Sequence, residues 1–247
     1  NNMINIKSLI IILFPEYYKS KKFNKIKQAT LKSIENKKGI EPELILLNKF
    51  INKGDYCFDI GANKGVYTYK FEQLTNSKNI YAFEPIPENY TFLKKMFTKC
   101  NIYSFALSDK TINSKFKIPI TKKKILHTRG KLNFKIIEDN EINYKSINVK
   151  CITLDLFVKK ENINRIDFLK IDVEGHELNV LKGAIKSIGK FHPIILIEVE
   201  QRVHSFKIKK IFDFIIDQGY SIKFYDLKKF KFKSITNFST YKNQNYE

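Results

Sequence analysis

Short apolar runs bounded by turn residues alternate along the chain with segments of helical periodicity. Continuous apolar runs predict strands at 55–60, 79–85, 101–109, 165–175 and 192–200. Apolar residues at intervals of three or four predict helices between and after them, at 64–76, 87–97, 176–188 and 204–218. Strands that alternate with helices in this way are typical of a parallel, doubly wound α/β sheet.

The alternation is interrupted at residues 110–150. This segment holds β-rich, partly alternating runs separated by polar and turn residues, at 114–120, 131–137 and 145–154. They predict antiparallel strands inserted where a helix would otherwise be expected. A closing pair of strands is predicted near the end of the chain, at 220–227 and 231–238.

The length of 247 residues and the hydrophobic fraction of 43% are sufficient for one large core. We therefore predict one domain at 51–235, with a basic helical extension at 1–50 and a polar tail at 236–247. Residues 20–38 of the extension place apolar side chains at helical spacing beneath a lysine face. This helix either packs on the domain or rests on an anionic membrane surface. The apolar run 9–14 is too short to span a bilayer, which takes about 20 residues.

The formal net charge of +20 arises in three segments that flank the predicted α/β elements. Residues 1–40 contribute +7 (9 basic, 2 acidic), residues 110–150 contribute +8 (11 basic, 3 acidic) and residues 206–247 contribute +5 (9 basic, 4 acidic). Only three of the 45 basic residues are arginine, the side chain preferred for bidentate contacts with bases and phosphates. This scarcity favours a compositional bias over a nucleic-acid groove. The alternative is a basic rim that attracts an anionic partner through its field.

Three cysteines, Cys57, Cys100 and Cys151, lie far apart in the sequence and form no CxxC pair. The pattern predicts reduced thiols in the core, as is usual in the cytoplasm, rather than a disulfide framework. The apolar run 9–14 is not followed by the small-residue cleavage site of a signal peptide. We therefore expect a cytoplasmic protein, with peripheral membrane contact as the alternative for its N-terminal segment.

A glycine-rich turn, within DYCFDIGANKGVYTY at residues 55–69, connects the first predicted strand to the first predicted helix. Such a turn brings backbone amides close to a ligand. The dinucleotide pattern GxGxxG does not fit, because positions 63 and 66 are Asn and Val. The pattern that fits is D-x-G-x-N-x-G, formed by Asp59, Gly61, Asn63 and Gly65, since Asn adopts positive φ at low cost.

Polar residues stand at the predicted carboxyl ends of three neighbouring strands. Asp59 belongs to the first and is suited to accept hydrogen bonds from an ammonium group. Glu84 ends the second, 19 residues after Gly65, where an acid accepts two hydrogen bonds from a ribose diol. Ser108 and Asp109 end the third, where they would meet an adenine amino group. Together these partners describe S-adenosylmethionine (S-adenosyl-L-methionine) as the cofactor.

Five stretches resemble, in their order over roughly residues 53–200, the FkbM family of S-adenosylmethionine-dependent methyltransferases: FDIGANKGVYT, AFEPIPENYTFLKK, ALSD, TLDLF and IDFLKIDVEGHELNVLKGA. The resemblance implies the class I methyltransferase fold, a Rossmann-like, mostly parallel sheet of seven strands with an antiparallel last strand. It also implies O-methylation of small molecules or of sugars in surface polysaccharides and natural products. The positions that it assigns to the cofactor side are Gly61, Asn63, Gly65, Glu84 and Asp109.

Methyl transfer to a hydroxyl group requires a base as well as positioning, because the hydroxyl proton is held far above neutral pH. The candidates are Asp172, expected where the strand in 165–175 ends, and Glu174 and His176, which follow it. Asp172 alternatively caps the next helix, since acids are favoured at helix N-termini. Glu198 and Glu200 end the following strand and would form a divalent-ion site with Asp172, but the family resemblance implies no metal.

The leading hypothesis is an O-methyltransferase that acts on a hydroxyl of a sugar, a polysaccharide precursor or a similar small molecule. The basic insertion at 110–150 would help to shape its acceptor site. An RNA methyltransferase would explain the charge, but no RNA-binding module is recognisable and arginine is scarce. A non-catalytic protein on the same fold, bound to membrane surfaces or nucleic acid, is the alternative from a different class. The sequence leaves the acceptor and the oligomeric state open.

Overall fold

The computed structural model describes residues 43–122, 125–126, 129–132, 137, 140–226 and 231–234. The predicted helix at 20–38 and the predicted tail at 236–247 lie outside the described residues, as does most of the predicted strand at 131–137. Within the described part of the chain, no helix is long and apolar enough to cross a membrane.

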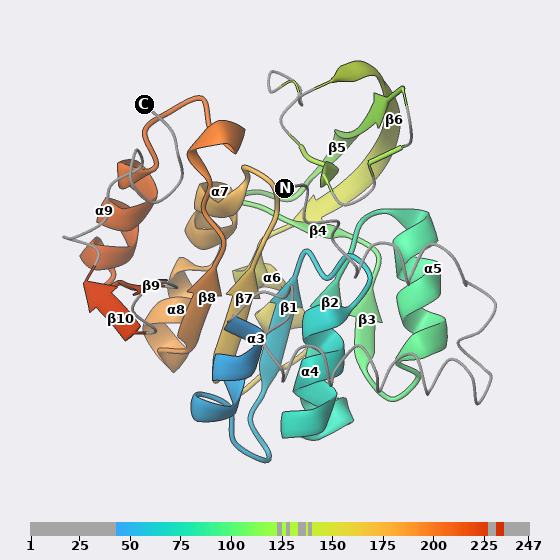
Figure 1. The fold of residues 1–247 in the computed structure, drawn as a ribbon. Helices are drawn as coiled ribbons and strands as arrows, with labels where there is room; N and C mark the ends of the chain where they lie inside the picture. Colours follow the sequence, from blue (N-terminus) through green and yellow to red (C-terminus); the bar gives the residue numbers. More distant parts are fainter. Residues whose placement is uncertain are drawn as a thin grey trace.

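Among the described residues, five parallel strands form the central sheet, in the order β3-β2-β1-β7-β8 (Figure 1). Their bounds are β1 (Cys57–Ile60), β2 (Ile80–Phe83), β3 (Asn101–Tyr103), β7 (Phe168–Ile171) and β8 (Ile194–Ile197). β1 lies at the centre, where Asp59 is in register with Ala82 of β2 and with Lys170 of β7. The mostly parallel α/β sheet is therefore confirmed, and its central strands carry the apolar runs expected of strands buried on both faces.

Helices pack on both faces of this sheet. One face is covered by α3 (Glu43–Leu46), α4 (Val66–Leu74) and α5 (Pro87–Met96), and the other by α6 (Leu154–Lys160), α7 (Glu177–Lys182), α8 (Ile185–Phe191) and α9 (Lys209–Asp217). Alternate residues of β1 belong to the two cores: Cys57 packs with the first group, and Phe58 and Ile60 pack with the second. Asp59 points to the α4 face, where Thr68 contacts it.

The predicted strand at 101–109 is divided. β3 belongs to the central sheet, whereas β4 (Ala106–Leu107) joins a second sheet of order β4-β6-β5, with β5 (Ile112–Thr121) and β6 (Glu141–Ile152). β5 and β6 pair antiparallel, and β4 pairs with β6 in parallel, which the sequence pattern did not predict. The insertion is thereby joined to the domain through β4 (Figure 1).

The predicted single helix at 176–188 is wrong, because α7 and α8 are separated at Gly183 and Ala184. A Cβ atom at Gly183 would lie 1.9 Å from the carbonyl oxygen of Ser108, so this position is where the end of β4 approaches the helix pair. The helix α6 also differs from the prediction, which extended a strand to residue 154. It begins after Thr153, whose Oγ1 accepts the N–H of Leu156 at 3.0 Å as an N-cap.

The closing strands β9 (Lys223–Asp226) and β10 (Lys231–Ser234) form the predicted pair, and they run antiparallel. Among the described residues they form a separate two-stranded sheet, so the central sheet contains five strands rather than the seven expected.

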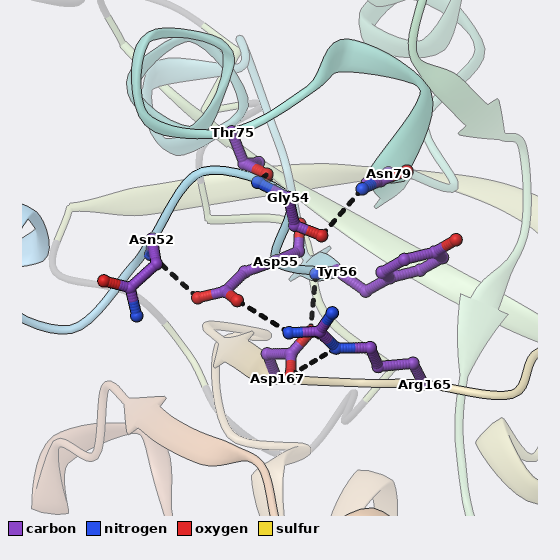
Figure 2. A network of polar contacts seen from close by, with 8 residues as sticks. All are labelled: Asn52, Gly54, Asp55, Tyr56, Thr75, Asn79, Arg165 and Asp167. Carbon is purple, nitrogen blue, oxygen red and sulfur yellow. Dashed lines mark hydrogen bonds and ion pairs between the residues drawn. The ribbon is translucent and has the colours of Figure 1, made fainter.

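A polar network fixes β1 against β7 at the amino ends of the strands (Figure 2). The guanidinium of Arg165 contacts Asp55 at 2.9 Å and Asp167 at 2.8 Å, and Asp167 accepts the N–H of Tyr56 at 2.8 Å. Nearby, the side chain of Asn79 donates to the carbonyl of Gly54 at 2.9 Å. These contacts hold the register in which the opposite, carboxyl ends of the two strands lie side by side.

An aromatic cluster dominates the core on the α6 face. The ring of Phe157, which is 2% exposed, lies between 4.9 and 6.3 Å from five other ring centroids. These rings belong to Phe58, Tyr81, Phe83, Tyr103 and Phe105. The cluster joins α6 to β1, β2 and β3 and to the segment that leads into β4.

Truncation of this ring should therefore be costly. We expect Phe157→Ala to lower the free energy of unfolding by about 3–5 kcal/mol, because it removes a large buried side chain and leaves a cavity. The matched control is Ile216→Ala on α9, where the side chain is 48% exposed and the expected loss is within about 0.5 kcal/mol. Urea unfolding of both variants measures the difference, and equal losses would contradict the central place given to Phe157.

Candidate active site

A cavity opens at the carboxyl edge of the central sheet, where ligands bind in open α/β sheets. Its lining comes from the end of β1 with the glycine turn, the end of β2 and the segment around β4. Parts of the insertion and the loop that follows β7 complete it. The lining residues are Ile60, Gly61, Asn63, Phe83, Glu84, Pro85, Ile86, Phe105, Ala106, Leu107, Phe116, Gly130, Leu132, Asp172, Val173, Glu174 and His176.

The glycine turn after β1 adopts left-handed backbone angles at three positions: Gly61 at φ 78°, Asn63 at φ 50° and Gly65 at φ 77°. A Cβ atom at Gly61 would lie 1.8 Å from the carbonyl oxygen of Asp172, so the turn and the loop after β7 touch backbone to backbone. Gly65 does not line the cavity. A Cβ there would lie 2.4 Å from the ring of Phe97, so this glycine serves the packing of α5.

Asp59 lies beneath the turn rather than in the cavity lining. Its carboxylate is fully buried and accepts the N–H and the hydroxyl of Thr68 at 2.9 and 2.7 Å. It therefore ties β1 to the first turn of α4.

Lys170, which the sequence analysis did not select, joins the two central strands at this edge. Its Nζ lies 3.3 Å from both Asp59 and Asp172 and donates to the carbonyl of Gly61 at 3.1 Å. Burial by itself lowers the pKa of Lys170, but Asp172 and Asp59 raise it more, so the pKa lies above its ordinary value. The signal in the sequence is a single lysine within an apolar strand, FLKID, because a buried lysine needs anionic partners.

Glu84 connects the end of β2 with the glycine turn. Its two carboxylate oxygens accept the N–H groups of Asn63 and Ile86, each at 2.8 Å, and the side chain lines the cavity. Burial raises the pKa of Glu84 to about 7, although both backbone hydrogen bonds act in the opposite direction. The position predicted for a ribose-binding acid thus holds a buried carboxyl group at the cavity wall.

Ser108 and Asp109 lie behind the cavity and contact it through His176. The Ser108 hydroxyl donates to Asp109 at 3.0 Å, and its oxygen lies 2.8 Å from Nε2 of His176. Since the hydroxyl has only one proton, Nε2 is the donor in the second contact. Burial lowers the pKa of His176 below its ordinary value, so the imidazole is neutral at pH 7.

The loop after β7, residues 172–176, contains two residues with left-handed backbone angles, Glu174 at φ 51° and Gly175 at φ 96°. The carboxylate of Glu177 accepts the N–H groups of Val173 at 3.3 Å and of Gly175 at 3.0 Å. The N-cap position of α7 is occupied by His176, so the alternative in which Asp172 caps this helix is not observed. Asp172 lines the cavity and pairs with Lys170.

Glu174 is a largely buried carboxyl group on the cavity wall. Burial raises its pKa to about 7, with a further increase from the neighbouring Asp172. Three cations, Arg202, Lys131 and Arg129, lower the pKa in part. Of the two other acids proposed at this edge, Glu198 and Glu200, the second contacts Arg202. Among the described residues, no group of three or more His, Cys, Asp or Glu side chains is placed to hold a metal ion.

Comparison with known proteins places these features in a family. A family model described as "Methyltransferase FkbM domain" matches residues 59–222. The chain is 24% identical over 169 residues to Methyltransferase 1 of Beauveria bassiana, a match that covers 58% of this chain and 68% of that protein. It is 23% identical over 193 residues to hexuronic acid methyltransferase AglP of Haloferax volcanii, covering 72% of this chain and 70% of that protein.

Among solved structures, the crystal structure of Methyltransferase FkbM from Methylobacillus flagellatus KT matches with a TM-score of 0.47 and 15% sequence identity. The match covers 69% of this chain and 39% of that chain.

The contact between Gly61 and Asp172 leads to a stability prediction. We expect Gly61→Ala to lower the free energy of unfolding by more than about 2 kcal/mol, because the new Cβ meets a backbone oxygen at a left-handed φ. Gly189→Ala is the control: no atom lies within 4 Å of its Cβ position, and alanine in helix α8 should raise stability by about 0.5–1 kcal/mol. Thermal and urea unfolding measure both; a neutral Gly61→Ala would show that the two loops do not need this approach.

Proposed function

The chain belongs to the FkbM methyltransferase family, and on this premise we propose that it transfers a methyl group from S-adenosyl-L-methionine to a hydroxyl of a sugar, a polysaccharide precursor or a similar small molecule. The observation that carries the proposal is one cavity whose lining includes the glycine turn and Glu84 together with residues of the loop 172–176. The first group suits a nucleoside cofactor, and the second offers proton acceptors to the substrate.

The residues on the cofactor side fit S-adenosylmethionine. Glu84 has a buried carboxylate at the end of β2 with lone pairs left for the ribose hydroxyls, and Gly61 and Asn63 let the backbone come close to the ligand. Ser108 and Asp109 are proposed to serve the adenine end from behind the cavity, and Asp59 to act indirectly by holding the turn. When bound, the cofactor supplies a methyl group that is already activated by a sulfonium.

The acceptor hydroxyl then needs a residue that takes its proton. The carboxylate of Asp172 is already engaged in an ion pair with the ammonium group of Lys170, 3.3 Å away. His176 is neutral, but its Nε2 donates to Ser108. Glu174 lines the cavity with a pKa of about 7, close to the pH at which a general base is most effective. We therefore assign proton acceptance to Glu174, and positioning of the acceptor to Asp172 and His176.

A sugar as the acceptor is supported by the relative from Haloferax volcanii, a hexuronic acid methyltransferase. Because that relative is 23% identical, we propose the acceptor only as a class of hydroxyl compounds. Incubation with S-adenosylmethionine carrying a labelled methyl group, and with panels of neutral sugars, uronic acids and polysaccharide precursors, would identify it. RNA is included as an alternative methyl acceptor. Binding to anionic vesicles is measured in parallel, as the test of the non-catalytic alternative.

The cofactor proposal is tested by calorimetric titration of the full chain. We expect micromolar binding of S-adenosylmethionine and S-adenosylhomocysteine and none of NAD. Glu84→Ala should weaken binding about tenfold or more, because it removes the acceptor of the ribose hydroxyls. Glu88→Ala is the matched control, since this carboxylate lies on α5 and pairs at the surface with Lys145. A folded sample that binds neither sulfur compound would overturn the methyltransferase proposal.

The base assignment predicts a pH dependence. Glu174 accepts a proton only when ionised, so kcat/KM should rise as the pH increases through about 7 and level off above it. Glu174→Gln should lower kcat by about a hundredfold or more and leave cofactor affinity unchanged. A pH midpoint that persists in Glu174→Gln and disappears in His176→Gln would instead identify His176 as the base.

A further inference from the structure

The turn η5 (Gln201–Val203), which follows β8, and the next residue, His204, meet the loop 172–176 and the start of α7 at three points, although the two segments are more than twenty residues apart in the sequence. Arg202 Nη2 lies 3.6 Å from the Glu174 carboxylate. A Cβ atom at Gly175 would lie 2.3 Å from the carbonyl oxygen of Val203, so the two backbones touch. His204 Nε2 lies 3.0 Å from the carboxylate of Glu177.

The guanidinium of Arg202 has a carboxylate on each side. Its Nη2 approaches Glu174, and its Nε forms a close ion pair with Glu200, the residue just before the turn. A planar guanidinium with two such partners is restricted in orientation. The Glu174 side chain is mostly buried, so this contact is made where water screens it only in part.

The backbone of the loop is held by a second pair. One oxygen of the Glu177 carboxylate accepts the N–H groups of Val173 and Gly175, and the other faces the imidazole of His204. Both side chains of this pair are buried, and the His204 ring packs at 4.9 Å from the ring of Phe206. The pair thus fixes the segment in which Glu174 adopts its left-handed backbone angle.

From these contacts we propose that the turn η5, together with His204, is a positioning element for the proposed catalytic base: Arg202 orients the Glu174 carboxylate and stabilises its ionised form, while Glu177 and His204 fix the loop backbone. The inference rests on the proposed role of Glu174 in methyl transfer. Arg202 acts through Glu174 and is therefore a positioning residue.

The charges that face Glu174 decide the direction of the effect. Asp172, at the end of β7, disfavours the ionised carboxylate, as does burial. The cations that favour it are Arg202 in η5, whose effect is the largest of the three, and Lys131 and Arg129 in the insertion. Removal of the Arg202 charge should consequently raise the pKa of Glu174, even though Lys131 and Arg129 remain.

The test is a ¹³C NMR titration of glutamate side chains in the unliganded full chain, with Glu174→Gln used to assign the Glu174 resonance. We expect Arg202→Gln to move the titration midpoint of Glu174 upward by about one pH unit or more. Arg202→Lys should restore most of the shift, because it keeps the charge. Lys78→Gln is the control: it removes an exposed cation two residues before β2, at the opposite edge of the sheet, and should leave the midpoint unchanged. Because the side chain of Arg202 is partly exposed, we expect the Arg202 variants to fold.

An unchanged midpoint in Arg202→Gln would overturn the role of Arg202. The titration needs neither cofactor nor acceptor, so it is independent of the proposed function. A shifted midpoint in a chain that transfers no methyl group would support the positioning element and reject the function. Where methyl transfer is found, the midpoint of the pH dependence of kcat/KM in Arg202→Gln should shift together with the NMR midpoint. A pH profile of kcat/KM that does not shift would overturn the proposal.

The clamp formed by Glu177 and His204 is tested by amide hydrogen exchange. We expect Glu177→Ala to accelerate exchange at Val173 and Gly175 about tenfold or more, because their acceptor is removed, while amides of β1 stay protected. His204→Gln should produce a smaller acceleration at the same two amides. Glu161→Ala, an exposed carboxylate after α6, is the control. Unchanged exchange at Val173 and Gly175 in both variants would overturn the clamp.

Discussion

The ammonium group of Lys170 lies between the carboxylates of Asp59 and Asp172, 3.3 Å from each, and also donates to the carbonyl of Gly61. Each charge needs the others at this place, because two neighbouring carboxylates would repel without the cation and a buried lysine would lose its proton without them. Two segments that line the cavity start next to this cluster of charges: the glycine turn, which follows β1, and the loop 172–176, which follows β7. The rest of the site depends on this arrangement.

Close backbone approach is the second constraint, and glycine supplies it at three contacts. Gly61 lies against Asp172, Gly175 against Val203, and Gly183 against Ser108. In each case a Cβ atom would be within 2.3 Å of a carbonyl oxygen. The first two contacts join the ends of β1, β7 and β8, and the third joins the end of β4 to the junction of α7 and α8, so the region around the site is built by connections between segments rather than by any single motif.

Within that frame, the partners of each acid separate their roles. Asp172 is paired with a buried lysine, Glu84 accepts two backbone N–H groups, and Glu174 lies in a largely buried position beside Arg202. The acids therefore differ in the charge that their surroundings favour, although they are chemically alike. Under the proposed function, this separation would let one cavity bind a nucleoside cofactor and also accept a proton.

The sequence by itself determined the parallel α/β sheet, the turn D-x-G-x-N-x-G, the position of Glu84 and the loop that carries Asp172, Glu174 and His176, because apolar periodicity and turn chemistry are local properties of the chain. Only the tertiary structure decided that β4 leaves the central sheet, that α7 and α8 are separated at Gly183, and that Asp59 faces α4 instead of the cavity. The role of Lys170 and the contact of Arg202 with Glu174 were also decided there. These features depend on which distant segments meet, and contacts across more than twenty residues leave no periodic trace in the sequence.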